Sequence, residues 1–302
     1  MVTYNPKDWI TPLLYFHKAD TFRKLLPLLI GIGLYTAGIN WIELKYLKLS
    51  DSSYVKNTTL MHNLLGFAIS MLLVFRTNTA YDRWWEGRKM WGSLVNSSRN
   101  LAVKLEVMLP VDAMNHKSFF GKLISMFARE MSIHLHKEKT RLSLDTEPHP
   151  EIPDFDRKRH IPAQIVIHLQ RRIQDLYREK VITGDQLITL NGEVQSLLDI
   201  CGACERIKNT PIPYSYSTFI KKFVAVYVLT LPFGFVFSLG YIAIPVVMFI
   251  FYVMASLELI AEEIEDPFGD DVNDLPTEKL ASNITGNVHD ILGLEQPVPK
   301  KA

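Results

Sequence analysis

The longest stretch without a charged side chain is the feature that most limits what this chain can fold into. It covers 35 residues, from Phe223 to Leu257. A helix needs about 20 mostly apolar residues to cross the roughly 30 Å hydrocarbon core of a bilayer. As a single helix the stretch would be about 50 Å long at 1.5 Å per residue, too long for one crossing. We therefore expect it to fold back near Gly240, in the sequence Ser-Leu-Gly-Tyr, and to form two membrane-spanning helices.

Two further charge-free stretches are long enough to cross a membrane. They cover residues 25–42 and 57–75. A soluble protein with long core helices is the alternative, but it would need other segments to cover these apolar faces. No segment shows a convincing period of two, which a half-buried strand would need, so we predict an all-α fold. The expected spans are 24–44, 57–75, 216–238 and 241–262.

Basic residues beside the expected spans indicate the orientation of the chain. They cluster before the first span, after the second and at the start of the third. The positive-inside rule then places both termini and residues 76–215 in the cytoplasm, and four spans agree with this. The loop at 45–56, which carries three lysines, would be external against the rule. A polar start without an early apolar segment argues against a signal peptide.

The segment between the second and third spans is long enough for a cytoplasmic helical domain. The spacing of its apolar residues predicts that the second span continues through 81–108 and that further helices occupy 117–138, 163–181 and 185–208. Thr183 and Gly184 mark the break before the last helix, and 145–162 is predicted to be a loop. The expected divisions are 1–75, 76–215, 216–262 and an acidic cytoplasmic segment at 263–302.

Residue types that carry enzyme or metal chemistry are sparse. Cys201 and Cys204 are too few for a four-cysteine zinc site or a disulfide framework, so we expect buried thiols on a helix, with redox chemistry as the alternative. His134 and His136 are two residues apart and would point to different sides of a helix. The sequence has no glycine-rich phosphate loop, Gly-x-Ser-x-Gly elbow or His-Glu-x-x-His motif. We therefore predict no enzyme activity, and we expect no nucleic-acid partner.

Three large apolar side chains lie on one face of the second span. Phe67, Met71 and Phe75 are spaced at i, i+4 and i+8 and cover about 12 Å of helix axis. Directly after them, from Arg76 onward, the helix becomes charged without a break. Such a helix can connect an apolar constriction in the membrane to a wet vestibule. Packing against neighbouring spans explains the same spacing, so periodicity alone leaves both interpretations open.

Three segments together resemble the signature of a known channel family. Residues 75–88 read Phe-Arg-Thr-Asn-Thr-Ala-Tyr-Asp-Arg-Trp-Trp-Glu-Gly-Arg and are followed by Trp91 and Gly92. Residues 210–216, Thr-Pro-Ile-Pro-Tyr-Ser-Tyr, stand just before the third span. Residues 262–271, Glu-Glu-Ile-Glu-Asp-Pro-Phe-Gly-Asp-Asp, stand just after the fourth. In this order, the segments make the chain similar to the bestrophin family, and their wording is closest to the bacterial branch.

The resemblance implies a homopentameric channel with one central pore in a lipid bilayer, here the bacterial inner membrane. The family's hydrophobic neck corresponds to Phe67, Met71 and Phe75, and its cytosolic aperture corresponds to Ile212. Animal members pass anions and are opened by calcium, whereas some bacterial members pass monovalent cations. The permeant monovalent ion, chloride or another anion against sodium or potassium, is therefore open. A secondary transporter is the alternative function, but the sequence lacks the internal repeats and midplane charge expected of one.

Fixed charges would set the selectivity, because the neck has none. Residues 76–215 carry 21 Lys and Arg against 17 Asp and Glu, whereas residues 257–302 carry 3 against 11. An apolar neck gates by dewetting, and aromatic ring edges slightly favour an anion, although Met71 interrupts the rings. The sequence does not show which segment faces the pore, so the sign of the permeant ion stays open.

Acidic residues crowd the end of the fourth span. Carboxylates in the last turns of a helix repel one another and oppose the helix dipole, so this crowd needs positive charge nearby. One solution is a basic partner at the same cytoplasmic level, from Arg76, Arg83 or Arg88. The crowded acids are Glu258, Glu262, Glu263, Glu265 and Asp266.

Calcium is the other solution, and it comes from the resemblance. Asp266, Asp271 and Asp274 match three positions of the calcium clasp in animal bestrophins, and Glu263 stands where that clasp has an amide. Oxygen ligands at short spacing suit calcium, but the run of acids is interrupted and no EF-hand pattern occurs. We expect Arg76 or a neighbouring basic residue to neutralise part of the cluster, calcium to bind weakly at most, and no cofactor to be required.

Overall fold

The computed structural model describes residues 20–47, 58–136, 155–156 and 159–295. Within these residues the regular secondary structure is helical and no strand occurs, which confirms the predicted all-α fold. The loops predicted at 45–56 and 145–162 fall largely outside the described residues. The chain divides into two compact units, with the divisions after Arg83, Thr210 and Glu265. We call Val2–Arg83 with Pro211–Glu265 the span unit, and Trp84–Thr210 with Asp266–Ala302 the helical-domain unit.

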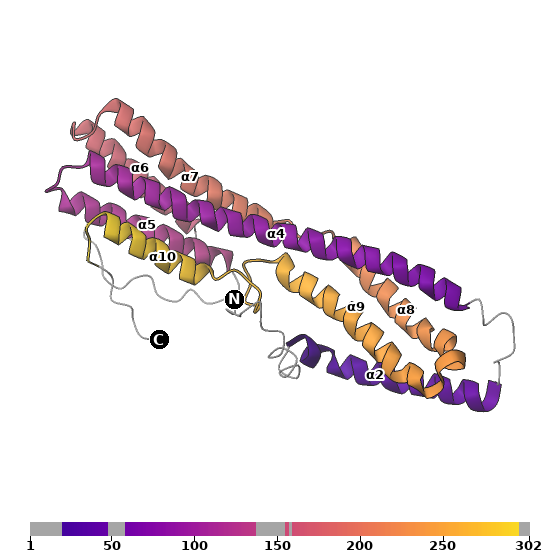
Figure 1. Ribbon diagram of the computed structural model, residues 1–302. Coiled ribbons are helices and arrows are strands. Elements are labelled where there is room, and N and C mark those ends of the chain that lie inside the picture. The colour runs from indigo at the N-terminus through magenta and orange to yellow at the C-terminus, as the bar shows by residue number, and fades with distance from the viewer. Residues whose placement is uncertain (1–19, 48–57, 137–154, 157–158, 296–302) are drawn as a thin grey trace. The chain divides into compact units, whose positions relative to one another are not determined.

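The span unit contains the apolar helices (Figure 1). Among the described residues, three segments are long and apolar enough to cross a membrane: Thr21–Tyr46, Leu60–Met108 and Tyr214–Glu265. Helices occupy all four stretches predicted to be spans. In chain order, the elements of this unit are α2 (Asp20–Ile42), the π-helical turn η2 (Glu43–Leu47), the first part of α4 (Thr58–Met108), α8 (Tyr214–Leu239), the 3-10 turn η4 (Gly240–Ile242) and α9 (Ala243–Glu265).

A break at Gly240 makes a hairpin of the last apolar segment. That segment has 52 residues, which as one straight helix would be about 78 Å long, far more than a bilayer core. Gly240 has a φ of 54°, in the left-handed region that favours glycine. The side-chain amide of Asn40 on α2 donates a 2.9 Å hydrogen bond to the Gly240 carbonyl. Helices α8 and α9 pack against each other, so the predicted hairpin is confirmed.

One face of α4 forms the core of the span unit. Gly66 lies so close to α8 that an added Cβ would come within 2.6 Å of the Tyr227 hydroxyl oxygen. A small residue here lets the two helices approach closely, as expected for helices packed in a membrane. The buried cluster joins α4, α8 and α9 and includes Ile69, Leu73, Val228, Leu231 and Val247.

The helical-domain unit packs its described helices around a separate apolar core. They are α4 from Trp84 onward, α5 (Met114–Leu135), α6 (Ile161–Arg178), α7 (Gly184–Asn209) and α10 (Thr277–Ile291). Helix α10 runs along α5, and α6 packs against α7 (Figure 1). Large side chains from four of these helices are buried completely, among them Trp91, Phe120, Phe127, Ile173 and Leu197.

The predicted helices of this unit are confirmed to within a few residues, with one omission. Helix α4 continues unbroken to Met108, as predicted. Thr183 caps α7 through a capping box with Gln186, which explains the predicted break at that point. Helix α10 was not predicted, because the acids of residues 263–302 dominate the composition of that segment. Its buried Ala281, Ile284 and Val288 nevertheless follow a helical spacing.

Candidate functional site

The predicted neck residues form an uncovered apolar stripe on α4. Phe67, Met71 and Phe75 are 68%, 44% and 54% exposed, whereas Ile69 and Leu73 on the opposite face are 1% and 2% exposed. The described spans of the same chain therefore do not cover the stripe. An apolar surface of this size that the chain itself does not cover can contact lipid, contact another subunit or line a pore.

The stripe is followed at once by a buried ion pair. Arg76 is 1% exposed, and its Nη2 lies 2.6 Å from Oε2 of Glu265. Its Nε lies 3.5 Å from Oε1 of Glu258, which is about two helical turns before Glu265 on α9. The prediction that Arg76 neutralises part of the acidic cluster is confirmed. Burying a guanidinium requires such partners, because an isolated charge away from water is very costly.

Glu265 joins the three sequence segments that carried the family resemblance. Its Oε2 accepts from Arg76, and its Oε1 accepts the backbone N–H of Ile212 at 2.7 Å. Its own carbonyl oxygen accepts a 3.0 Å hydrogen bond from Nε of Arg83. One residue at the end of α9 therefore holds the helix that carries the stripe and the segment that precedes α8. In the sequence Glu265 is one of five crowded acids, and no local pattern indicates these contacts.

The predicted aperture residue, Ile212, lies in the short segment before α8 and is half-buried. Pro211 and Pro213 flank it and restrict the backbone on both sides, and α8 begins immediately afterwards at Tyr214. The hydrogen bond to Glu265 uses the only free backbone N–H among these three residues, because proline has none. The flanking prolines and this hydrogen bond therefore hold the backbone of Ile212 in place within the span unit.

The other crowded glutamates also have basic partners. Nζ of Lys24 on α2 lies 3.0 Å from Oε1 of Glu263, and Lys221 on α8 pairs with Glu262. Together with the Arg76 pairs, these contacts give every glutamate of the cluster a cation. Glu263, predicted as a calcium-clasp position, is therefore engaged with Lys24 in the span unit.

The three predicted clasp aspartates lie in the helical-domain unit, in the loop between α9 and α10. Oδ1 of Asp266 accepts from the Phe268 N–H at 3.2 Å, and Oδ2 of Asp274 accepts from the Asp271 N–H at 2.5 Å. Oδ1 of Asp274 is buried without a hydrogen-bond partner. Burial, aided by repulsion from Asp271, Asp266 and Asp270, raises the pKa of Asp274 to about 7, although the Asp271 N–H opposes the rise. A cation would satisfy this oxygen, but the three carboxylates do not converge as a set within 4.8 Å in the part of the chain described.

The Trp-Trp-Glu-Gly segment of α4, residues 84–87, holds this loop. Nε1 of Trp84 donates a 2.9 Å hydrogen bond to the Asn273 carbonyl. A Cβ on Gly87 would lie only 3.0 Å from Pro267 and 3.1 Å from Phe268, so the loop approaches α4 where a side chain is absent. Phe268 itself is fully buried in the core of the helical-domain unit. These residues of the family-like segment therefore have a structural role.

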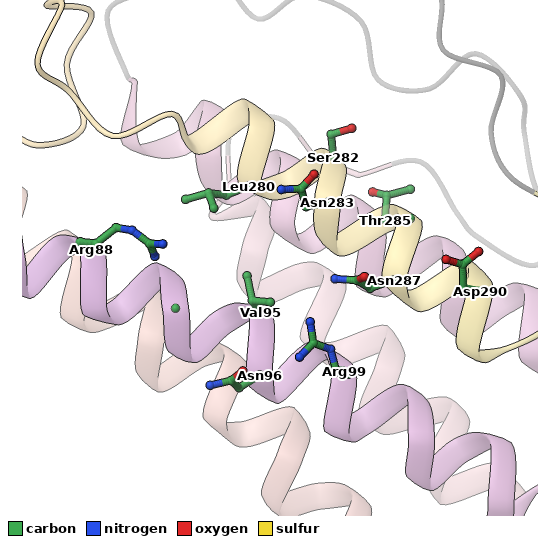
Figure 2. Close-up of a pocket in the computed structure, with 12 residues that line it drawn as sticks. Arg88, Val95, Asn96, Arg99, Leu280, Ser282, Asn283, Thr285, Asn287 and Asp290 are labelled. Atoms are coloured by element: carbon green, nitrogen blue, oxygen red, sulfur yellow. The ribbon is translucent and has the colours of Figure 1, made fainter. Parts of the chain in front are cut away.

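A polar pocket of about 870 Å³ lies between α4 and α10 in the same unit. Figure 2 shows Arg88 and Arg99 on α4 at its wall, with Arg99 extending toward Asn287 on α10. Within the described residues, neither arginine forms an ion pair. With Asp290 as its one acidic lining residue, the pocket carries a net positive charge and suits an anionic group.

The two cysteines are buried free thiols on α7, as predicted. Burial, with a smaller contribution from Glu205, raises the pKa of Cys201 to about 12. Burial likewise raises the pKa of the Cys204 thiol. Because the thiolate is the reactive form, these cysteines are poor nucleophiles at neutral pH.

Sequence reasoning also missed a cluster formed by His134, His160 and Glu205 in the helical-domain unit. The comparison of His134 with His136 was correct in excluding that pair. His136 Nδ1 instead contacts the Ser132 carbonyl oxygen. The partners of His134 come from segments 26 and 71 residues away, which no local spacing could indicate.

Comparison with known proteins agrees with these features. The family described as Bacterial/Fungal Bestrophin protein matches residues 1–290. A voltage-dependent anion channel-forming protein of Nostoc sp. is 34% identical over 242 residues, covering 77% of each chain. Another of that name from Ralstonia nicotianae is 29% identical and covers 97% of this chain and 95% of its own. These relatives carry channel names and not enzyme names.

Solved structures show the same fold. A crystal structure of a bacterial bestrophin homologue from Klebsiella pneumoniae superposes with a TM-score of 0.74 at 25% identity, covering 88% of this chain and 98% of its own. A crystal structure titled as a membrane protein reaches a TM-score of 0.78 at 27% identity, with 90% and 99% covered. The family match spans nearly the whole chain, and the three signature segments meet at Glu265. The chain therefore belongs to the bestrophin family.

Proposed function

We propose that this protein is a subunit of a homopentameric anion channel in the bacterial inner membrane, with both termini in the cytoplasm. The observation that carries the proposal is the uncovered stripe of Phe67, Met71 and Phe75 on α4, followed directly by the buried Arg76. Around a central axis, five such stripes would form a narrow apolar neck. An apolar constriction of this kind closes by dewetting and conducts when it is wetted.

The hydrogen bonds of Glu265 support a second constriction at Ile212. The same carboxylate holds Arg76, next to the neck, and the backbone of Ile212. A movement of α4 would therefore be transmitted to the segment that carries Ile212. We infer that neck and aperture respond together and that Glu265 is the residue that couples them.

Anions are favoured over sodium or potassium by two observations. The relatives reported above are named as anion channel-forming proteins. On α4, Arg88 and Arg99 line a pocket with a net positive charge, and such charge attracts anions within about a Debye length. Reversal potentials of purified protein in a potassium chloride gradient separate the two choices, because the sign of the potential reports the permeant ion.

Calcium is proposed as an optional ligand and not as a required cofactor. The unpartnered Oδ1 of Asp274 fits a cation, and Asp266 and Asp271 lie in the same loop. Calcium requires six to eight oxygen ligands at about 2.3–2.6 Å, which these three side chains do not supply on their own. Weak binding is therefore the expected result.

The test of the neck is the triple replacement of Phe67, Met71 and Phe75 by alanine. Current through proteoliposomes or planar bilayers should rise, because a wider constriction stays wet. The matched control replaces Phe233, Phe249 and Val253, exposed apolar residues of α8 and α9, by alanine.

The control variant should conduct like the wild type. Size-exclusion chromatography checks that both triple variants assemble. If both variants then carry equal currents, the three residues on α4 contribute only to helix packing and do not form the neck. Single-channel steps distinguish the channel from a secondary transporter, which turns over far too slowly to produce them.

A further inference from the structure

Three metal-binding residue types meet at one end of the helical-domain unit. His134 is the penultimate residue of α5, His160 is the N-cap of α6, and Glu205 lies near the end of α7. Nε2 of His134 and Nε2 of His160 lie 2.5 Å and 2.8 Å from the same oxygen, Oε1 of Glu205. The two imidazole rings are edge to face with their centroids 4.6 Å apart. One candidate ligand atom from each residue lies within 4.8 Å of the others.

We propose that His134, His160 and Glu205 form a binding site for one divalent transition metal ion, with zinc as the best fit. Two imidazole nitrogens and one carboxylate oxygen are a ligand set that zinc uses, with a water as the fourth ligand. Imidazole suits zinc, nickel and copper, whereas calcium and magnesium prefer oxygen alone. The site lies outside the residues assigned to the pore.

The surroundings allow entry of a metal ion and keep the ligands in place. The side chains of His134, His160 and Glu205 are 17%, 37% and 31% exposed, so water reaches the cluster. Beneath them lies the apolar core that α5, α6 and α7 share. Lys208, one turn after Glu205, donates to the Leu135 carbonyl and ties the ends of α7 and α5 together. The three ligands therefore come from elements whose relative positions are set by packing.

Oε1 of Glu205 already lies between the two imidazole rings, 2.5 Å from Nε2 of His134 and 2.8 Å from Nε2 of His160. In a tetrahedral zinc site, two ligand atoms lie about 3.3 Å apart. The two imidazole nitrogens therefore need to move away from the carboxylate oxygen by less than about 1 Å to make room for the ion.

The hydrogen bond of His160 to the backbone predicts one cost of binding. Its Nδ1 accepts the Ala163 N–H at 3.0 Å, so in the neutral ring the hydrogen is on Nε2, which faces Glu205. A metal ion on Nε2 requires this hydrogen to move to Nδ1, and the cap of α6 is then lost. Losing an N-cap weakens binding by about tenfold. This cost is small beside the affinity of zinc sites, so binding remains favourable.

The test is isothermal titration of zinc chloride into the untagged full-length protein in detergent at pH 7.5. We expect one zinc ion per chain with a Kd on the order of 1 µM. Glu205→Gln and His160→Gln should each weaken binding by at least about 100-fold, since loss of an outer-shell partner alone costs up to this much. His136→Gln is the matched control, because His136 lies two residues from His134 and contacts a backbone carbonyl instead. It should bind zinc like the wild type.

Two further measurements distinguish a variant that has lost a zinc ligand from a variant that has failed to fold. Thermal unfolding of each variant in EDTA shows whether it is folded, and zinc should raise the melting temperature of the wild type and of His136→Gln only. Cobalt in place of zinc should give visible absorption bands that disappear in Glu205→Gln. No saturable zinc binding by the wild type below 100 µM would overturn the proposal, as would undiminished binding by folded His160→Gln and Glu205→Gln. In either case the cluster would be a hydrogen-bonded contact only.

Discussion

The two units of the chain differ in how far they bury their phenylalanines. In the helical-domain unit, Phe120 and Phe127 are fully buried by the chain itself. In the span unit, Phe67, Phe75 and Phe249 are 68%, 54% and 66% exposed. Apolar surface removed from water contributes about 25 cal/mol per Å², so a set of exposed aromatic rings of this size favours contact with lipid or protein over contact with water. The helical-domain unit is therefore stabilised by its own core, whereas the span unit presents apolar surface that suits a bilayer.

Two ion pairs, one from each unit, differ in the same way. In the helical-domain unit, the side chains of Arg178 and Asp175 are 72% and 52% exposed. The span unit buries Arg76 with Glu258 and Glu265. A buried pair is costly to break because the remaining charge is left without a partner, whereas an exposed pair contributes little. The following experiments test this comparison, from the largest expected effect to the smallest.

The largest effect is expected for Phe127→Ala, compared with Phe67→Ala. Replacing a buried phenylalanine by alanine leaves a cavity and lowers the free energy of unfolding by about 3–5 kcal/mol. Phe67 is exposed in the single chain, so its replacement should change conduction much more than stability. The measurement is thermal unfolding of both variants in detergent, together with bilayer current. Equal losses of stability would contradict the difference between the units.

The next effect concerns the buried ion pair. Arg76→Gln or Glu265→Gln should each cost about 2–3 kcal/mol, somewhat less than a completely buried pair because Glu265 is partly exposed. The double variant should lose less than the sum of the two single variants. A double-mutant cycle measured by thermal unfolding gives this coupling.

The control for the ion pair is the exposed contact between Arg178 and Asp175 on α6. Its removal by Arg178→Gln should change stability by about 0.5 kcal/mol or less. If the Arg76 and Glu265 variants behave like this control, Glu265 does not anchor α4 and the Ile212 segment, and the proposed coupling of neck and aperture is incorrect.

A smaller effect on stability, but a clear effect on conduction, is expected for Ile212→Ala. Ile212 is only half-buried, so truncation should cost about 1 kcal/mol or less. If five copies form an aperture, permeability ratios among anions of different size should change while the yield of assembled protein does not. The readout is the reversal potential under bi-ionic conditions. An experimental map with Ile212 directed away from the axis would exclude the aperture.

The smallest effect is expected from calcium. Asp271→Asn with Asp274→Asn should change calcium binding very little, because the wild type is expected to bind no tighter than about 10⁻⁴ M. Calorimetry of both proteins and bilayer currents in calcium or in chelator test this. Micromolar binding that is lost in the double variant, together with chelator-sensitive current, would show that the aspartate loop is a functional calcium site.

The elements of the fold were largely predictable, whereas the contacts of the site were only partly so. Charge-free stretches and apolar spacing predicted α4, α8 and α9 closely, because hydrophobicity and period are local properties. The partner of the acidic cluster was predictable as Arg76, since unbalanced charge at a helix end needs neutralisation. Helix α10 was overlooked because its acidic flanks hid a short apolar spacing.

By itself, the sequence determined that the chain is helical, where its apolar spans lie and which residues on α4 share a face. Each of these follows from spacing within a single segment. Only the tertiary structure decided that the Phe67, Met71 and Phe75 face is the uncovered one, that Glu265 holds both Arg76 and Ile212, and that His134 meets His160 and Glu205. Arg76 and Glu265 are 189 residues apart. Contacts over such separations depend on how whole helices pack, and the spacing within any one helix contains no record of that packing.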